Sequence, residues 1–194
     1  MSLLLTRLAP PAELPVTLAE AKAHLKIEHA DEDALLTDLI ARATDTLDGP
    51  RGSLARCLVE QTWRVACAGP IHGRIALPMA PVLVITAARH WTAAGAEIAL
   101  DPTDFWLMGD ADGAWIEPAM GAPWPQLADR ADAISFDVTA GFGAPGDVPP
   151  GIRHAILLLV GHWHRNREAA GAPIVALPLG VEHLVALHRR GWVG

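Results

Sequence analysis

The chain has 194 residues, of which 51% are hydrophobic and 19% are charged, and its formal net charge is −7. This length suits one domain with a real hydrophobic core, and so large an apolar share excludes a disordered chain. A transmembrane helix needs about 20 consecutive apolar residues, and no stretch of the sequence approaches that length. The three leucines at 3–5 are too few for a signal-peptide core, so we expect synthesis in the cytoplasm.

The charge is unevenly distributed along the chain. Residues 151–194 carry five arginines against two glutamates, a net of +3, whereas residues 1–150 carry ten basic and twenty acidic side chains, a net of −10. Proteins that bind nucleic acid without sequence preference usually present a basic stripe. The mostly acidic chain therefore disfavours tight DNA binding, although its arginine-containing end leaves a small DNA-binding module as an alternative.

Two helices are expected near the N-terminus. Thr17 and Glu20 have the spacing of a capping box, which predicts a helix that opens at Thr17. Asp31 is the expected cap of a second, longer helix, and Gly49-Pro50 predicts its end. The apolar positions of this second helix recur on one face: Leu35, Leu36, Leu39, Ile40, Ala43 and Leu47.

The residue pattern changes between about residues 60 and 140, where short apolar runs are separated by Pro, Gly and Asp. This pattern predicts antiparallel strands joined by turns. Asp112-Gly113, between two tryptophan-containing runs, is the strongest hairpin signal. The expected strands lie at 62–65, 74–77, 82–87, 105–108, 114–117 and 134–139.

Pro149-Pro150-Gly151 introduces an apolar helix that we expect to end near Glu168. A last short helix is expected from Val181 to Arg190. The layout predicts an α+β fold that is mainly α. It combines a helical pair at 14–50, an inserted antiparallel β region at 59–140 and C-terminal helices at 149–190.

No constellation of residues indicates catalysis. The segment 141–146 matches GxGxxG, but prolines interrupt the following turn and no further strand completes a nucleotide-binding unit, so a Gly-rich connection explains it better. Among nine histidines, His162 and His164 are two apart on a helix and point about 200° from each other. Cys57 and Cys67 are interpreted as buried, reduced thiols. We expect no catalytic, metal or cofactor site, and a metal-dependent hydrolase is the less favoured alternative.

The order and spacing of several short motifs resemble those of the head–tail connector (adaptor) proteins of long-tailed bacteriophages and gene transfer agents. The resemblance extends over about residues 14–190. In the first part of the chain the motifs are residues 15–26 followed by 33–36, and then Gln61-Thr62-Trp63. In the middle they are Leu77-Pro78 with Pro81-Val82, and Trp124-Pro125. The last motifs are Ala140-Gly141-Phe142 through Val148-Pro149 to Ile152, Ala155 and Ile156, then the stretch 162–168, and finally residues 177–181.

The resemblance implies a structural virion protein of the particle neck and not an enzyme. Residues 1–194 would form a single connector domain, a helical bundle with a β insertion, with no membrane partner. About twelve copies would form a ring beneath the portal protein, and a tail-side connector or stopper protein would dock on that ring. DNA would pass through the lumen without sequence-specific binding, and an acidic wall would keep it from adhering.

In related connectors the C-terminal segment reaches the portal. The resemblance therefore implies that residues 177–194 contact the portal through Leu184, Leu187, Arg189, Arg190 and Trp192. An alternative is that Leu184 and Leu187 simply pack on the chain's own core.

Overall fold

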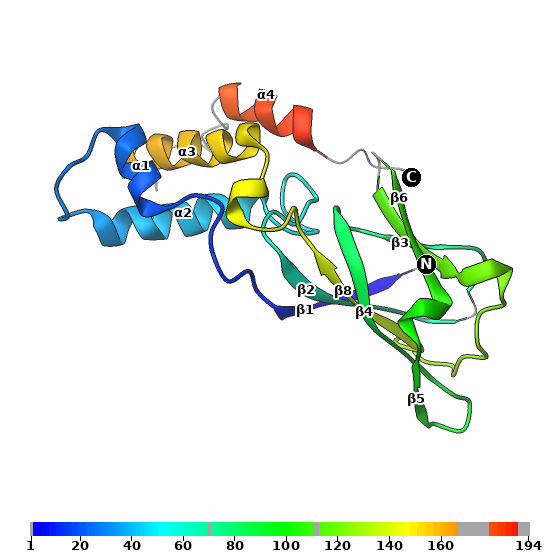
Figure 1. Ribbon diagram of the computed structural model, residues 1–194. Helices are drawn as coiled ribbons and strands as arrows, with labels where there is room; N and C mark the ends of the chain where they lie inside the picture. The colour runs from blue at the N-terminus through cyan, green and yellow to red at the C-terminus, as the bar shows by residue number, and fades with distance from the viewer. Residues whose placement is uncertain (1, 70, 111–112, 167–178, 190–194) are drawn as a thin grey trace. The chain divides into compact units, whose positions relative to one another are not determined.

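A computed structural model describes residues 2–69, 71–110, 113–166 and 179–189. Figure 1 shows two compact units, each built from segments that are distant in the sequence. The helical unit combines residues 13–59 with 142–189, and the β unit combines residues 2–12 with 60–141. That both units act as a single connector domain remains a prediction.

The helical unit contains four α-helices, among the described residues. They are α1 (Leu18–Leu25), α2 (Asp33–Leu47), α3 (Pro150–Arg165) and α4 (Leu179–His188). The predicted capping box is confirmed: the Thr17 hydroxyl accepts from the Glu20 amide at 3.2 Å, and the Glu20 carboxylate accepts from the Thr17 amide at 2.9 Å.

The predicted cap of the second helix is wrong. Helix α2 begins at Asp33 after Glu32, and no side chain caps it. The Asp33 amide donates to the Ala30 carbonyl at 3.1 Å, so a tight turn occupies the position where Asp31 was expected to start the helix. The carboxylate of Asp31 lies 3.7 Å from the imidazole of His29 instead.

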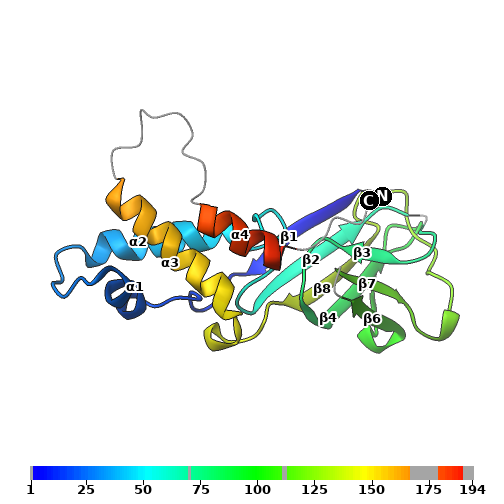
Figure 2. The same ribbon diagram turned by 90° about the horizontal axis from the view of Figure 1, so that it is seen from above.

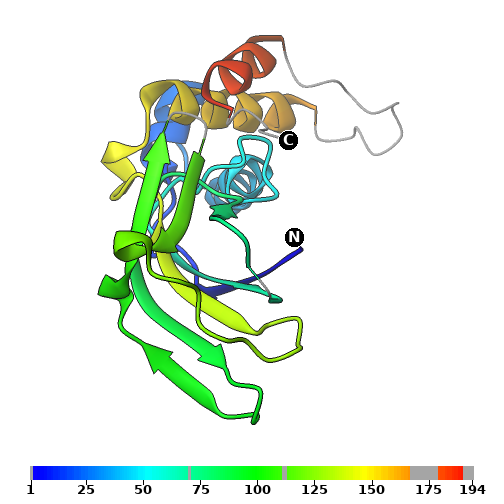
Figure 3. The same ribbon diagram turned by 90° about the vertical axis from the view of Figure 1, so that its right-hand side faces the viewer.

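The core of the helical unit joins apolar stripes from α2, α3 and α4. Figures 2 and 3 show α4 (red) beside α3 (yellow to orange). Helix α3 ends at Arg165, before the expected end near Glu168, which lies outside the described residues. The buried stripe residues are Leu36, Leu39, Ile40, Ala43 and Leu47 of α2, Ile152, Ala155, Ile156, Leu159 and Val160 of α3, and Val181 and Val185 of α4.

The β unit contains two antiparallel sheets (Figure 2). The first has the order β1 (Leu3–Ala9), β2 (Gln61–Cys67), β8 (Ile134–Ala140), β4 (Val82–Trp91) and β5 (Glu97–Leu100). The second has the order β3 (Ile75–Leu77), β7 (Gly113–Pro118) and β6 (Phe105–Asp110). All six expected strands are present. Asp110 is opposite Gly113, as the expected hairpin requires, although Asp112 lies outside the described residues.

The prediction of a mainly α fold is wrong. The described residues form four α-helices and eight strands, with strand and helix residues nearly equal in number. Two strands were missed: β1 and β5 are edge strands whose side chains are largely exposed, so neither shows the alternation that marks a half-buried strand. Strand β4 also continues four residues beyond its expected end at Ala87.

Aromatic side chains join the two sheets. Phe136 on β8 meets Phe105 on β6 edge to face, with ring centroids 4.9 Å apart, and Phe105 stacks on Trp124 at 5.8 Å. Phe136 is 1% exposed, and Ile116 of the second sheet is fully buried. The β unit is therefore a sandwich whose interior depends on the inward side chains of β8.

We expect Phe136→Ala to lower the free energy of unfolding by about 3–5 kcal/mol, because it leaves a cavity between the sheets. Urea unfolding followed by tryptophan fluorescence measures this change. Thr6→Ala, at an exposed position of β1, is the control and should stay within about 0.5 kcal/mol of the wild type. Equal urea midpoints for Phe136→Ala and the wild type would contradict this packing.

Candidate functional site

Helix α4 carries the described part of the surface expected to contact a portal. Leu187 is 66% exposed, and Arg189, just beyond the helix, is also exposed. Leu184 is half-buried and packs against the helical core. Arg190 and Trp192 lie outside the described residues. The structure thus brings Leu187 and Arg189 to one exposed end of α4 and places Leu184 at the edge of the core.

The exposed end of α4 is held firmly within the helical unit. Val181 and Val185 are buried in the core shared with α3. The Arg56 guanidinium donates to the His188 carbonyl at 2.7 Å, where a cation also favours the negative end of the helix dipole. A partner that binds this end would therefore meet a positioned helix terminus.

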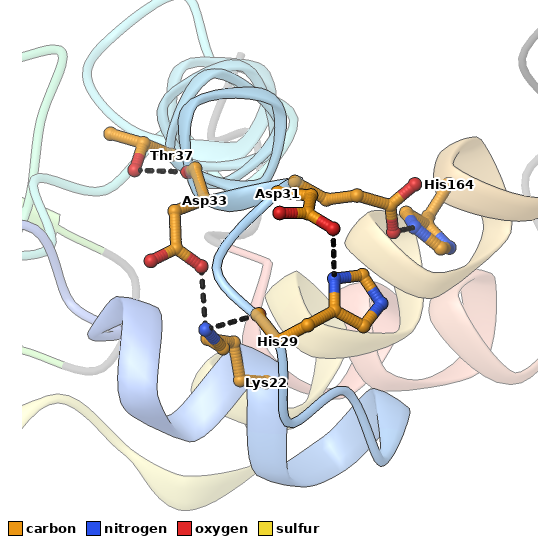
Figure 4. Close-up of polar contacts among 7 residues, drawn as sticks. Lys22, His29, Asp31, Asp33, Thr37 and His164 are labelled. Carbon is orange, nitrogen blue, oxygen red and sulfur yellow. Dashed lines mark hydrogen bonds and ion pairs between the residues drawn. The ribbon is translucent and has the colours of Figure 1, made fainter.

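Charged groups also fix the connection between α1 and α2 (Figure 4). Lys22 on α1 donates to the His29 carbonyl at 2.7 Å and to the Asp33 carboxylate at 2.6 Å. The imidazole of His164 on α3 lies 2.9 Å from the Glu32 carboxylate. Sequence reasoning missed the pair of Glu32 and His164, because no local spacing indicates a contact between residues 132 apart.

The opening of α1 is tied to α3 by a second ion pair, between Glu20 and Arg153. The pKa of Glu20 lies below its ordinary value. The largest cause is the hydrogen bond from the Thr17 amide, which lowers the pKa. Burial comes next and acts to raise it, whereas the Thr17 hydroxyl and the positive charge of Arg153 lower it further. Arg153 also donates to the Pro15 carbonyl at 3.1 Å, so α3 holds both the start of α1 and the segment before it.

The β unit contains a buried carboxylate on the face of the larger sheet that points away from Phe136. Asp137 on β8 receives two hydrogen bonds from Arg64 on β2, at 2.7 and 2.9 Å, and one from Arg89 on β4, at 3.0 Å. The side chain of Asp137 is 11% exposed, against 38% for Arg64 and 24% for Arg89. Three neighbouring strands are therefore linked across one face by a single carboxylate, which sequence analysis did not predict.

The electrostatics of Asp137 favour its ionised form. Burial is the largest influence and acts to raise its pKa. The hydrogen bond from Arg64 and the charges of Arg89 and Arg64 together outweigh burial, so the pKa lies below the ordinary value. The same hydrogen bond raises the pKa of Arg64.

The remaining sequence features are the potential metal ligands, the Gly-rich connection and the two cysteines. No three His, Cys, Asp or Glu side chains in the described part of the chain are placed to hold a metal ion. Gly141 and Gly143 adopt φ of +136° and +117°, which suits glycine in the connection from β8 to α3. Cys57 and Cys67 are buried, as expected, and burial raises the pKa of Cys67 to about 11. None of the helices within the described ranges has the length and apolar character needed to cross a bilayer.

Comparison with known proteins gives one family match and several structural matches. Residues 15–71 match the family described as phage gp6-like head-tail connector protein. A chain in the neck of an empty gene transfer agent (GTA) particle, computed with C6 symmetry, has a TM-score of 0.80 and 27% identity, covering 98% of this chain and 97% of that chain. No curated protein sequence matches the chain.

Two further solved structures cover almost the whole chain. A chain in the virion of a native GTA particle has a TM-score of 0.78 and 26% identity, over 98% of this chain and 97% of that one. A chain in the neck of a native GTA particle, computed with C12 symmetry, has a TM-score of 0.75 and 28% identity, over 100% of this chain and 98% of that one.

The shared fold and the shared sequence together define a structural connector protein of a virion-like particle neck. The chain is a head–tail connector protein of the neck of a phage or GTA particle, and the match to the phage gp6-like family extends over its residues 15–71. The predicted resemblance to head–tail connectors, the structural rather than enzymatic role and the location in the neck are confirmed.

We expect Asp137→Asn to lower the free energy of unfolding at pH 7 by about 1–3 kcal/mol, because two partly buried guanidinium groups lose their counter-charge. Urea unfolding at several pH values measures the effect. Because the pKa of Asp137 is lower in the folded protein, its stabilisation is complete above about pH 4 and declines as pH falls further. The difference in the free energy of unfolding between Asp137→Asn and the wild type should therefore shrink as pH falls below about 4.

Asp132→Asn is the matched control, because Asp132 also forms a two-point hydrogen bond with an arginine, Arg130, but on the exposed surface. Exposed ion pairs contribute little to stability, so the free energy of unfolding of this variant should be close to that of the wild type. Equal losses for the two variants would show that burial of Asp137 has no special role.

Proposed function

We propose that this connector forms a closed ring of about twelve copies between the portal protein and the tail. The main support is the similarity over the full chain to a protein in a GTA neck computed with C12 symmetry. A joint on the particle axis is expected to close on itself, because cyclic symmetry satisfies every subunit contact without leaving a free end. Both the helical unit and the β unit share in this similarity, which favours their working as one connector domain.

The portal-facing surface in this proposal is the exposed end of α4, with Leu187 and Arg189. Support comes from the combination of an apolar side chain left in water and a helix fixed by Val181, Val185 and the hydrogen bond from Arg56. Arginine is enriched among the residues that contribute most to protein interfaces, and Leu187 would add apolar area beside Arg189. The second partner is the tail-side connector or stopper protein.

The DNA path in this proposal is the lumen of the ring, without sequence-specific contacts. Residues 13–48 of the helical unit carry nine acidic and three basic side chains. Several of the acids are exposed, among them Glu28, Asp38 and Asp45. A wall of like charge repels the phosphate backbone and lets DNA slide past. This acidic surface favours passage of DNA over the alternative of a DNA-binding module.

Loss of the whole protein should leave DNA-filled heads that have no tails. Electron microscopy of particles from producing cells that lack the gene, compared with cells complemented by the wild-type gene, tests this expectation. Normal tailed particles in the absence of the gene would refute the proposed joint between head and tail.

We expect Leu187→Asp to fold normally but to reduce the yield of tailed particles by about tenfold or more, because a carboxylate replaces the apolar anchor. Complementation of the gene deletion measures the yield. A point variant is required because truncation before α4 would also remove Val181 and Val185 from the core. Ala186→Asp is the matched control, since it adds the same charge at the adjacent exposed position of the same helix. A full yield with Leu187→Asp would exclude Leu187 as a portal contact.

A further inference from the structure

Large apolar side chains are exposed on the hairpin of β6 and β7. Trp106 is 46% exposed and Met108 is 45% exposed. Met120, just beyond β7, is 91% exposed and has a positive φ of 56°, an uncommon conformation for a residue other than glycine. Exposed apolar groups concentrated on one element are typical of protein interaction sites.

The strand register places these residues on the outside of the smaller sheet. Met108 is opposite Trp115 and Trp106 is opposite Glu117, whereas the intervening pair, Leu107 and Ile116, alternates to the inside. Ile116 is fully buried, which fixes the direction of the alternation. We call the outward residues Trp106, Met108, Trp115 and Glu117 the hairpin face. Arg74 lies 4.2 Å from the centroid of the Trp115 ring.

The outside of the larger sheet also exposes apolar side chains. Leu4 on β1 is 47% exposed and Val84 on β4 is 49% exposed. Their register partners, Ala66 and Thr139, lie on the side of the sheet opposite to Phe136. We call Leu4 and Val84, together with Arg64, Asp137 and Arg89 between them, the sheet face.

The two faces lie on opposite outer surfaces of one sandwich. Phe105 of the smaller sheet and Phe136 of the larger sheet meet between the sheets, so side chains on the other side of each sheet point away from each other. In a ring every subunit offers two different surfaces, and each surface meets the other kind on a neighbour. Two unlike apolar faces on opposite sides of one rigid sandwich satisfy this requirement.

We propose that the hairpin face of one copy packs on the sheet face of the next copy, so that the β units form a continuous belt around the ring. This inference rests on the ring proposed above. Twelve copies in a closed ring require a turn of about 30° from one sandwich to the next. Trp106 and Met108 would cover Leu4 and Val84.

The charges on the two faces are compatible with this contact. The hairpin face carries the carboxylate of Glu117 together with Arg74 over Trp115, whereas the centre of the sheet face has two arginines around one carboxylate. Arg64 is the more exposed of the two arginines and is therefore the better partner for Glu117.

Cysteine cross-linking in particles tests the contact. Particles are prepared from producing cells whose only copy of the gene encodes both Met108→Cys and Val84→Cys, and are treated with a short bismaleimide. Denaturing gels should then show a ladder of dimers, trimers and larger species. The native cysteines should not interfere, because Cys57 and Cys67 are buried and the pKa of Cys67 is raised to about 11.

Two comparisons distinguish contact between the hairpin face and the sheet face from contact between two identical faces. Particles that contain a mixture of Met108→Cys chains and Val84→Cys chains should give cross-linked dimers but no larger species, and either single variant alone should give none. Ile98→Cys combined with Met108→Cys is the matched control, because Ile98 is 44% exposed but its partner His90 places it on the inner side of β4 and β5. This control pair should give no ladder.

The outcomes distinguish failure of the contact from failure of the ring. A ladder with Met108→Cys and Val84→Cys, and none with the control pair, supports the proposal. If the protein is present in tailed particles with a symmetric neck but no ladder forms, the belt is wrong and the ring stands. Dimers from Met108→Cys alone would show that two hairpin faces meet each other, which also overturns the proposal. Absence of the protein from tailed particles would refute the ring together with the belt.

Discussion

The β unit depends on strand β8, which is buried on both faces. On one face Phe136 joins the larger sheet to the smaller one through Phe105, and on the other Asp137 links β2 and β4 through their arginines. A central strand that is fixed on both sides determines the register of its neighbours, because a slip of one residue would exchange Phe136 with Asp137. Such a slip would bury the carboxylate among apolar side chains and expose the ring.

The helical unit depends on helix α3 in the same way that the β unit depends on strand β8. Helix α3 binds the start of α1 through Arg153, the start of α2 through His164, and α4 through its apolar stripe. Polar side chains make the contacts at both ends of α3, whereas its middle is apolar, so these contacts fix the position of α3 along its own axis. The position of the exposed end of α4 depends on the same core, because Val181 and Val185 pack in it.

Local features of the sequence were sufficient to predict most elements, but not the contacts between them. The capping box at Thr17, the apolar stripes of α2 and α3 and six strands each depend on residues close together in the chain. Strand β1 is different: it is defined by its pairing with β2, more than fifty residues away, and its largely exposed side chains give no alternating pattern. The link from Asp137 to Arg64 spans 73 residues, so no motif could indicate it. The excess of helix in the prediction follows from the same cause, because helical periodicity is local and edge-strand pairing is not.

The placement of exposed apolar groups explains why a connector requires so ordered an interior. Trp106, Met108 and Leu187 lie on strands and a helix, and each of these elements is fixed from behind by buried neighbours such as Ile116 and Val185. Apolar anchors on rigid elements lose little conformational freedom when a partner covers them, so more of their burial contributes to association. In the proposed ring this advantage would recur at every subunit contact, and the buried links around β8 and α3 would act on assembly through the orientation of the surfaces they support. A flexible loop with the same side chains would bind a single partner, but it would not fix the angle between neighbours that allows a ring to close.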